Sequence, residues 1–340
     1  MQQLLVRAFG RKRMKQMYYN ITCFLNPGYR RALNRVKKQF ILLTAEQQEE
    51  LHQLVCSRYQ SEPETPEDDT IRRQDIEDHS MGRLSGFRHR TVPWLNSIKP
   101  LNQCNVLEIG CGTGCTTVAL AEQGCNLTSI DVSRESVELA RKRSGLYGLA
   151  VDIRVLNAAQ ISEHGGKYDL IIFPDSLEHM TYAERIASIR AAWSLLENDG
   201  LLAVVGTPNR LYFFDRHSSL LPFYHWLPDE LAMQYARYSP RQACIDSPRD
   251  ITTFLRFGRG ASYHEFELAL EIKGADLEMY DMQSFMKTLL LTKLAHRTEY
   301  RYMKMLKALG PAGLPRGFYW EQLHIAIRKP SQPERESENA

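Results

Sequence analysis

The segment Val106–Gly114, which reads VLEIGCGTG, constrains the fold more than any other part of the chain. An apolar run typical of a buried strand passes directly into three alternating glycines, and a helical pattern follows from Thr116. Glycine permits a tight turn and lets a ligand approach the backbone without a Cβ in the way. The N–H groups of the loop and the start of the helix can then hold an anionic group. The segment therefore predicts a ligand site at the end of a strand.

Residues 104–208 alternate between short apolar strands and helices with short connections. Strands that are buried on both faces read as continuous apolar, β-branched runs, so the pattern predicts an α/β fold with a parallel sheet. The expected strands are 105–109, 127–130, 153–156, 169–173 and 201–205, and the expected helices are 116–123, 133–144 (capped by Ser133) and 182–196.

A second strand feature supports a ligand that contains a ribose. Asp131 ends the second expected strand, seventeen residues after Gly114. An acid at that strand tip can accept hydrogen bonds from both hydroxyls of a ribose, outside the carboxyl ends of the strands where such sheets bind ligands. Nicotinamide and flavin folds usually carry G-x-G-x-x-G, whereas this loop is G-x-G-x-G with Glu108 two residues before it.

The segment VLEIGCGTG, followed by SIDVS, resembles the class I S-adenosylmethionine (SAM)-dependent methyltransferases. Residues 168–172 with Leu177–His179 resemble the fourth-strand motif of the subgroup that includes the ubiquinone-biosynthesis O-methyltransferases, and 198–210 resembles its fifth strand. The resemblance covers about 80–210 well and 262–330 loosely. It implies a Rossmann-like, mostly parallel seven-stranded sheet with helices on both faces, and SAM as the cofactor.

The same resemblance assigns cofactor-binding roles to particular residues. Its glycines would wrap the methionine end of SAM, and the acid before them would orient the loop. The family usually places an Asp after the third strand for the adenine amino group, where this chain has Asn157-Ala158; an Asn oxygen can also accept that hydrogen bond. The expected cofactor residues are Glu108, Gly110, Gly112, Gly114, Asp131 (ribose), Val132 (adenine), Asn157, Ala158 and Phe173 (backbone, near the amine).

His179 is the expected catalytic residue by resemblance. Methyl transfer is an in-line displacement in which the protein mainly supplies position. A base is needed only when the nucleophile arrives protonated, and an imidazole titrates near neutrality. The alternative reading is a structural histidine at the start of a helix, and His217, His225 and His264 are weaker candidates.

Cysteine usage bears on metals and on the cellular compartment. The seven cysteines are irregularly spaced, and none forms a C-x-x-C pair. This pattern favours reduced thiols in a cytoplasmic protein over disulfides or a zinc site, so we expect no metal.

Two segments exceed the minimal fold. The first, about 210–262, is rich in aromatic residues, and in this family such an insertion tends to cover the acceptor; an ordinary small core is the alternative. The second, about 284–309, reads as a basic amphipathic helix capped by Ser284, with Glu299 as its one acid. It predicts either peripheral contact with an anionic membrane or a lid or homodimer helix with a solvated face.

Two segments near the N-terminus differ in charge from the rest of the chain. Residues 1–45 contain ten Lys or Arg and no acid, and residues 61–78 contain eight acids. We therefore expect a basic helical arm and acidic linker at 1–78, with 61–69 as the linker itself. The methyltransferase domain would span 79–330, and 331–340 would be a disordered tail.

The combined prediction is a methyltransferase acting on a small-molecule acceptor, by O-methylation of an apolar or aromatic metabolite. One alternative is a methyltransferase acting on RNA or protein. Against it, Phe173–Ser176 lacks the Asn/Asp-Pro-Pro-Tyr/Phe motif and the net charge is only +3, so nucleic acid is not the expected partner. The other alternative is a non-catalytic SAM-binding protein.

Overall fold

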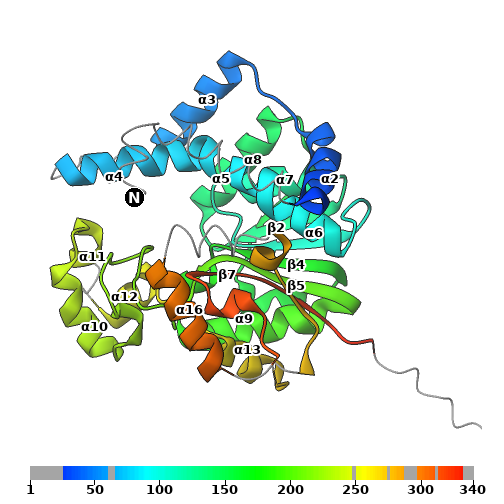
Figure 1. Cartoon of the computed structure of the whole chain (residues 1–340). Helices are drawn as coiled ribbons and strands as arrows, with labels where there is room; N and C mark the ends of the chain where they lie inside the picture. Colours follow the sequence, from blue (N-terminus) through cyan, green and yellow to red (C-terminus); the bar gives the residue numbers. More distant parts are fainter. Residues whose placement is uncertain are drawn as a thin grey trace, which may run out of the picture.

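A seven-stranded sheet forms the centre of the computed structural model, which describes residues 26–59, 66–246, 250–273, 276–286, 297–310 and 313–331. The strand order is β3-β2-β1-β4-β5-β7-β6, and Figure 1 shows the sheet in the middle of the molecule with β2, β4, β5 and β7 labelled. All neighbours pair in parallel except β7, which runs antiparallel to β5 and β6. The strands are β1 (Asn105–Ile109), β2 (Asn126–Asp131), β3 (Asp152–Val155), β4 (Tyr168–Pro174), β5 (Leu196–Pro208), β6 (Met279–Asp281) and β7 (Gln322–Arg328). The expected Rossmann-like, mostly parallel sheet is confirmed.

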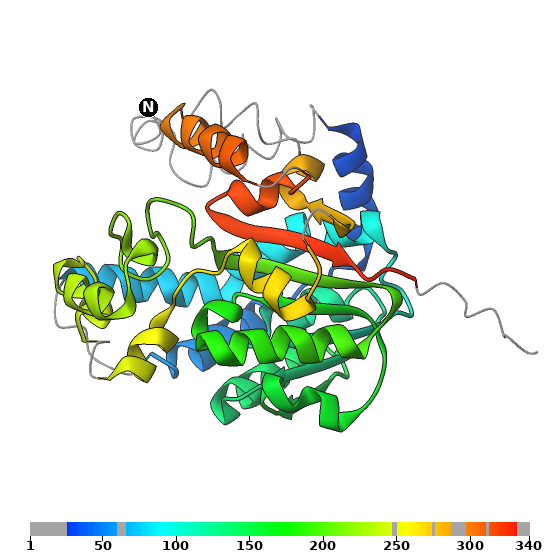
Figure 2. The ribbon, with the colours of Figure 1, turned by 90° about the horizontal axis from the view of Figure 1, so that it is seen from below.

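Helices cover both faces of the sheet because successive strand residues point to opposite sides. Leu170 and Ile172 of β4 pack with the N-terminal helices and α7, whereas Ile171 and Phe173 pack with α9 and α13. Figure 2 shows the helices on the two faces of the sheet. The described helices are α2 (Pro27–Val36), α3 (Ala45–Cys56), α4 (Pro66–Glu77), α5 (Arg83–Gly86), α6 (Val92–Ile98), α7 (Cys115–Ala121), α8 (Arg134–Leu146), α9 (Tyr182–Leu195), α10 (Asp229–Tyr235), α11 (Gln242–Asp246), α12 (Ile251–Phe257), α13 (Tyr263–Leu270), α14 (Met282–Met286) and α16 (Arg297–Leu309).

The N-terminal helices share the core of the sheet. Tyr29 and Leu33 of α2 and Leu51 of α3 are buried in the same hydrophobic cluster as Val106 of β1. Residues 66–69, expected to belong to a linker, are instead the first turn of α4. Two π-helical segments, η2 (Asp78–Gly82) and η3 (Phe87–Thr91), join α4, α5 and α6 into one continuous helical run. π-Helical segments occur often at functional sites, and this run passes the cleft described below.

The structure agrees with the predictions for the two insertions to different degrees. Residues 210–262 form α10, α11, α12 and short 3-10 turns around a small core of their own. The start of the 284–309 helix is corrected, since α14 begins at Met282 and the backbone N–H of Ser284 donates to Asp281 at 2.7 Å. Asp281 therefore takes the capping role expected of Ser284.

Several predicted features lie outside the described residues: most of the basic arm, the middle of the 284–309 helix and nearly all of the tail. Within the described ranges, no helix is both long enough and apolar enough to cross a membrane.

Candidate cofactor-binding site

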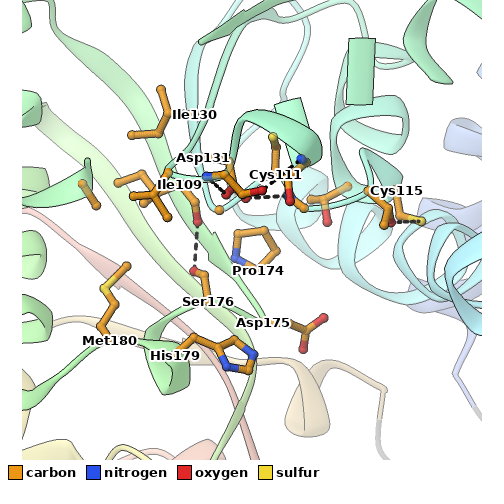
Figure 3. A pocket seen from close by; sticks show the side chains of 18 of the residues that line it. Ile109, Cys111, Cys115, Ile130, Asp131, Pro174, Asp175, Ser176, His179 and Met180 are labelled. Atoms are coloured by element: carbon orange, nitrogen blue, oxygen red, sulfur yellow. Dashed lines mark hydrogen bonds between the residues drawn. The ribbon is translucent and has the colours of Figure 1, made fainter. Parts of the chain in front are cut away.

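A cleft of about 620 Å³ opens where β1, β2 and β4 end (Figure 3). This is the edge at which open α/β sheets bind ligands, and the volume is that of a small-molecule site. The glycine loop and Asp131 line it from one side, and Asp175 and His179 line it from the other. The long N-terminal helical run adds His79, Arg83 and Phe87 to its wall.

The three glycines of the loop have left-handed backbones, with φ of 90° at Gly110, 51° at Gly112 and 78° at Gly114. A Cβ on Gly110 would lie 2.5 Å from the Cβ of Ser176, and one on Gly114 would lie 2.9 Å from the Cα of Ala140. Packing within the protein therefore requires glycine at both places. A Cβ on Gly112 would meet nothing within 4 Å, so this glycine leaves room on the cleft side for a ligand.

Asp131 connects the loop to the second strand. One carboxylate oxygen accepts the backbone N–H of Gly112 at 2.9 Å, and the other accepts that of Ser133 at 2.9 Å. The carboxylate lines the cleft and is half-buried, so each oxygen keeps a lone pair for a ligand hydroxyl. This geometry fits the ribose role expected of Asp131.

Glu108 lies beneath the loop. Its side chain is fully buried and accepts hydrogen bonds from the hydroxyls of Thr117 at 2.6 Å and Ser129 at 2.7 Å. Burial raises the pKa of Glu108 to about 7, against the effect of those hydroxyls. Glu108 is not among the cleft-lining residues, so it holds the helix and strand behind the loop instead of facing a ligand.

The expected adenine end of the cleft contains Val132, Asn157 and Ala158. Val132 is 65% exposed and lines the cleft, so its side chain is free to pack against a planar ring. The side-chain oxygen of Asn157 accepts the N–H of Ala159 at 2.9 Å and begins the 3-10 helix η4 (Ala158–His164). That oxygen therefore has one lone pair already engaged.

Phe173 is completely buried and does not line the cleft. Pro174, Asp175 and Ser176 line it instead, one to three residues further along. Asp175 has φ of 44°, and a Cβ on Gly206 would lie 1.7 Å from its Oδ1, so the carboxylate lies directly against this glycine. Burial, with Glu178 nearby, raises the pKa of Asp175 to about 6.

Arg83 was not identified from the sequence, because no local motif marks it. Its guanidinium donates to Asp175 at 3.1 Å and to Asp78 at 3.2 Å at the cleft wall. A cation in the wall of the cleft can attract the carboxylate of the methionine moiety. Together with Asp131, the open Gly112 face and the exposed Val132, the residues present fit SAM.

His179 lines the cleft at the end of the short helix η5 (Leu177–His179). Its Nδ1 lies 2.9 Å from the carbonyl oxygen of Arg256. A carbonyl only accepts, so Nδ1 carries the hydrogen and Nε2 has a free lone pair.

The fold also gathers three side chains that can hold a metal ion, although the sequence analysis predicts no metal site. The ligand atoms of Glu178, His179 and His217 lie within 4.8 Å of one another. Oε1 of Glu178 is buried without a hydrogen-bond partner, and Nε2 of His217 lies 3.7 Å from it. Burial would raise the pKa of Glu178, but the two histidines hold it below its ordinary value. No spacing rule could show this cluster, because His217 comes from the insertion.

The expected aromatic wall is wrong for this cleft. Among the described residues of the 210–262 insertion, Arg256 lines the cleft and none of the aromatic residues does. The aromatic side chains pack among themselves: Phe213 and Tyr302 have ring centroids 5.0 Å apart, and Tyr224 lies 6.1 Å from Phe254. The side of the cleft opposite the glycine loop is therefore polar, because Asp175 and His179 line it.

The sequence and structure were compared with known proteins. Residues 106–200 match the family model described as a methyltransferase domain. A ubiquinone biosynthesis O-methyltransferase of Pseudomonas aeruginosa is 32% identical over 126 residues, which cover 36% of this chain and 53% of that protein. The corresponding protein of Actinobacillus pleuropneumoniae is 34% identical over 102 residues, covering 28% and 43%. The chain thus spans about half the length of the curated relatives it matches.

Among solved structures, the magnesium protoporphyrin IX methyltransferase of Synechocystis PCC 6803 with bound SAM is 28% identical. The match covers 40% of this chain and 64% of that one, with a TM-score of 0.34.

Proposed function

We propose that this chain, whose sheet and glycine loop form a class I SAM-dependent methyltransferase domain, transfers a methyl group from SAM to the hydroxyl of a small-molecule acceptor. The observation that carries the proposal is the Asp131 carboxylate, which bonds Gly112 of the loop and faces the cleft beside the exposed Val132. The comparisons support oxygen as the acceptor atom, because the relatives named above are O-methyltransferases.

In this proposal the cleft residues bind and orient the two reactants. SAM supplies an electrophilic methyl group on its sulfonium. Asp131 accepts the ribose hydroxyls, Val132 packs against the adenine, and Asn157 and Ala158 meet its edge. Gly112 leaves room for the methionine end, whose carboxylate Arg83 attracts.

His179 takes the proton of the acceptor hydroxyl at Nε2. Its Nδ1 hydrogen is held by the Arg256 carbonyl, so the ring is fixed in the tautomer that a base requires. Asp175 lies on the same side of the cleft and can accept a hydrogen bond from a second hydroxyl of the acceptor. These two groups favour an acceptor with hydrogen-bonding substituents, and the aromatic or apolar body of the acceptor is proposed from the relatives alone.

The test is transfer of label from methyl-labelled SAM to a panel of catechols, phenols and carboxylic acids, with bulk RNA and denatured protein as separate arms. Asp131→Ala serves as the control for cofactor-dependent transfer. We expect label in a phenolic product and S-adenosylhomocysteine (SAH) as coproduct. Label in RNA or protein alone would contradict the small-molecule assignment, and absence of SAM and SAH binding would contradict the activity itself.

A further inference from the structure

We propose that Cys115 is a reactive thiolate paired with Arg143 in the wall of the cofactor cleft, and that its oxidation by a hydroperoxide weakens cofactor binding. The first part stands on the side-chain geometry alone. The second part rests on the proposed function, because it takes this cleft to be the SAM site.

Arg143 of α8 is a buried charge without a carboxylate partner. The residue has no exposed surface, and within the part of the chain that the structure describes no carboxylate oxygen lies within 4.0 Å of its guanidinium. Two of its hydrogen bonds go to the main-chain carbonyls of His79 and Ser80, and its Nε is buried without a partner. An isolated buried charge is costly, so a nearby group is expected to carry the balancing negative charge.

Cys115 is the group in position to carry that charge. Its Sγ lies 2.8 Å from Nη1 of Arg143. The hydroxyl of Thr113 lies 3.6 Å from the same sulfur and can donate to it. As a neutral thiol, Cys115 would donate to the carbonyl oxygen of His79 at 3.4 Å, and the same oxygen also accepts a hydrogen bond from Nη2 of Arg143. Adjacent guanidinium groups stabilise thiolates, and the thiolate is the reactive form of cysteine.

Cys111 provides an internal comparison. Both cysteines line the cleft, and both are 4% exposed (Figure 3). No guanidinium donates a hydrogen bond to Cys111 in the described residues, and burial raises the pKa of its thiol. The two thiols therefore share their access from the cleft and differ in the cation beside the sulfur.

The proposed modification is a two-electron oxidation. The Cys115 thiolate attacks one oxygen of hydrogen peroxide, the O–O bond breaks, and hydroxide leaves and takes up a proton to become water. The sulfur becomes a sulfenate and the peroxide is reduced. The added oxygen lies at the first residue of α7, directly after the glycine loop, and reduces the space for the methionine end of SAM.

The first experiment is carboxamidomethylation of the full chain by limiting iodoacetamide between pH 6 and 9. Tandem mass spectrometry locates the label, because no Lys or Arg lies between Cys111 and Cys115. We expect Cys115 to react about tenfold or more faster than Cys111 at pH 6.5, with little dependence on pH. Equal rates, or a Cys115 rate that rises about tenfold per pH unit like that of an ordinary thiol, would overturn the proposal.

Arg143→Met is the matched variant, and it should bring the ratio of the two rates close to one. If that variant does not fold, the pH profile of the unaltered protein still decides, since it needs no substitution.

The second experiment measures SAH binding by calorimetry before and after treatment with hydrogen peroxide. We expect treated protein to bind SAH about tenfold more weakly, dimedone to trap the sulfenate on Cys115, and dithiothreitol to restore the affinity. Cys115→Ser should show the same SAH affinity before and after peroxide. Unchanged affinity in oxidised protein would overturn the second part of the proposal. If untreated protein binds no SAH, the proposed function fails. The ratio of the iodoacetamide rates of Cys115 and Cys111 then still tests whether Cys115 is a thiolate.

Discussion

The backbone N–H of Gly112 donates to the carboxylate of Asp131 over 2.9 Å, so the acid that we propose as the ribose ligand also fixes the loop that we propose to hold the methionine end. The second oxygen of the same carboxylate holds the N–H of Ser133, just before α8. One side chain therefore sets the distance between the two ends of the cofactor site.

Replacing Asp131 tests this coupling. Asp131→Ala removes both backbone contacts and the ribose acceptor, and hydrogen bonds to a charged group contribute about 1.5–3 kcal/mol each, so SAM affinity should fall by about a hundredfold or more. Asp131→Asn keeps one acceptor oxygen and should lose about tenfold. Calorimetric titration with SAM measures both. Binding by the Ala variant at the original affinity would show that the ribose does not lie at Asp131.

Alanine substitutions at Gly112 and Gly206 distinguish a glycine that leaves room for a ligand from one that leaves room for a neighbouring side chain. Gly112→Ala places its Cβ in the open cleft, so it should cost about 1–2 kcal/mol of stability from its left-handed backbone but should strongly weaken SAH binding. Gly206→Ala places its Cβ 1.7 Å from Asp175 Oδ1, so it should cost more, about 2–4 kcal/mol. Urea unfolding and calorimetry on both variants check the pair. A Gly112→Ala protein that binds SAH normally would contradict the assignment of the cleft.

The sequence was sufficient to predict the strands and helices that a short stretch of residues specifies by itself. Apolar runs identified five strands of the sheet, and Ser133 caps α8 as expected, with its hydroxyl accepting the N–H of Ser136. β6 is three residues long, too short for a periodic signal. The N-terminal helices could not be placed either, since their docking depends on the fit of Tyr29 and Leu33 to a distant surface.

For the site, the sequence predicted the residues at strand ends and missed the residues that converge from elsewhere. Asp131 and Val132 follow a strand, so their position at the cleft could be expected. Arg83 comes from the helical run and His217 from the insertion, so only the tertiary fold places them near Asp175 and Glu178. The aromatic prediction failed because composition does not show which way a side chain faces.

His179→Ala tests the proposed base. Because His179 lies on the acceptor side, the change should lower the methylation rate about a hundredfold or more while SAH affinity changes little. Equal rates in both proteins would exclude the role. A chelator in the same titrations should leave SAH affinity unchanged, because His179 is the member of the Glu178–His179–His217 cluster that lines the cleft and it lies on the proposed acceptor side.

The membrane hypothesis now depends on α16. Lys304 and Lys307 are exposed beside Met305 and Leu309, which are 47% and 76% exposed. Each basic residue near an anionic surface contributes about 1 kcal/mol, so Lys304→Glu should weaken co-sedimentation with phosphatidylserine vesicles about tenfold at low salt. Lys142→Glu on α8 makes the same change in net charge and should have little effect. Equal loss in both variants, or no vesicle binding by the unaltered protein, would contradict a specific role for α16.

Glu108 should make the stability of the protein depend on pH. Its folded pKa of about 7 lies above the ordinary 4.5, so the folded state binds a proton that the unfolded state releases between these values. The stabilising contribution of the protonated carboxyl is therefore complete below about pH 4.5 and is lost as the pH rises through 7. Glu108→Gln cannot titrate and nearly preserves the shape. The free energy of unfolding of Glu108→Gln, relative to that of the unaltered protein, should therefore rise by up to about 3 kcal/mol between pH 4.5 and pH 8. Urea unfolding across that range measures this difference. A stability difference that stays constant with pH would show that Glu108 is ionised in its buried position, held there by Thr117 and Ser129.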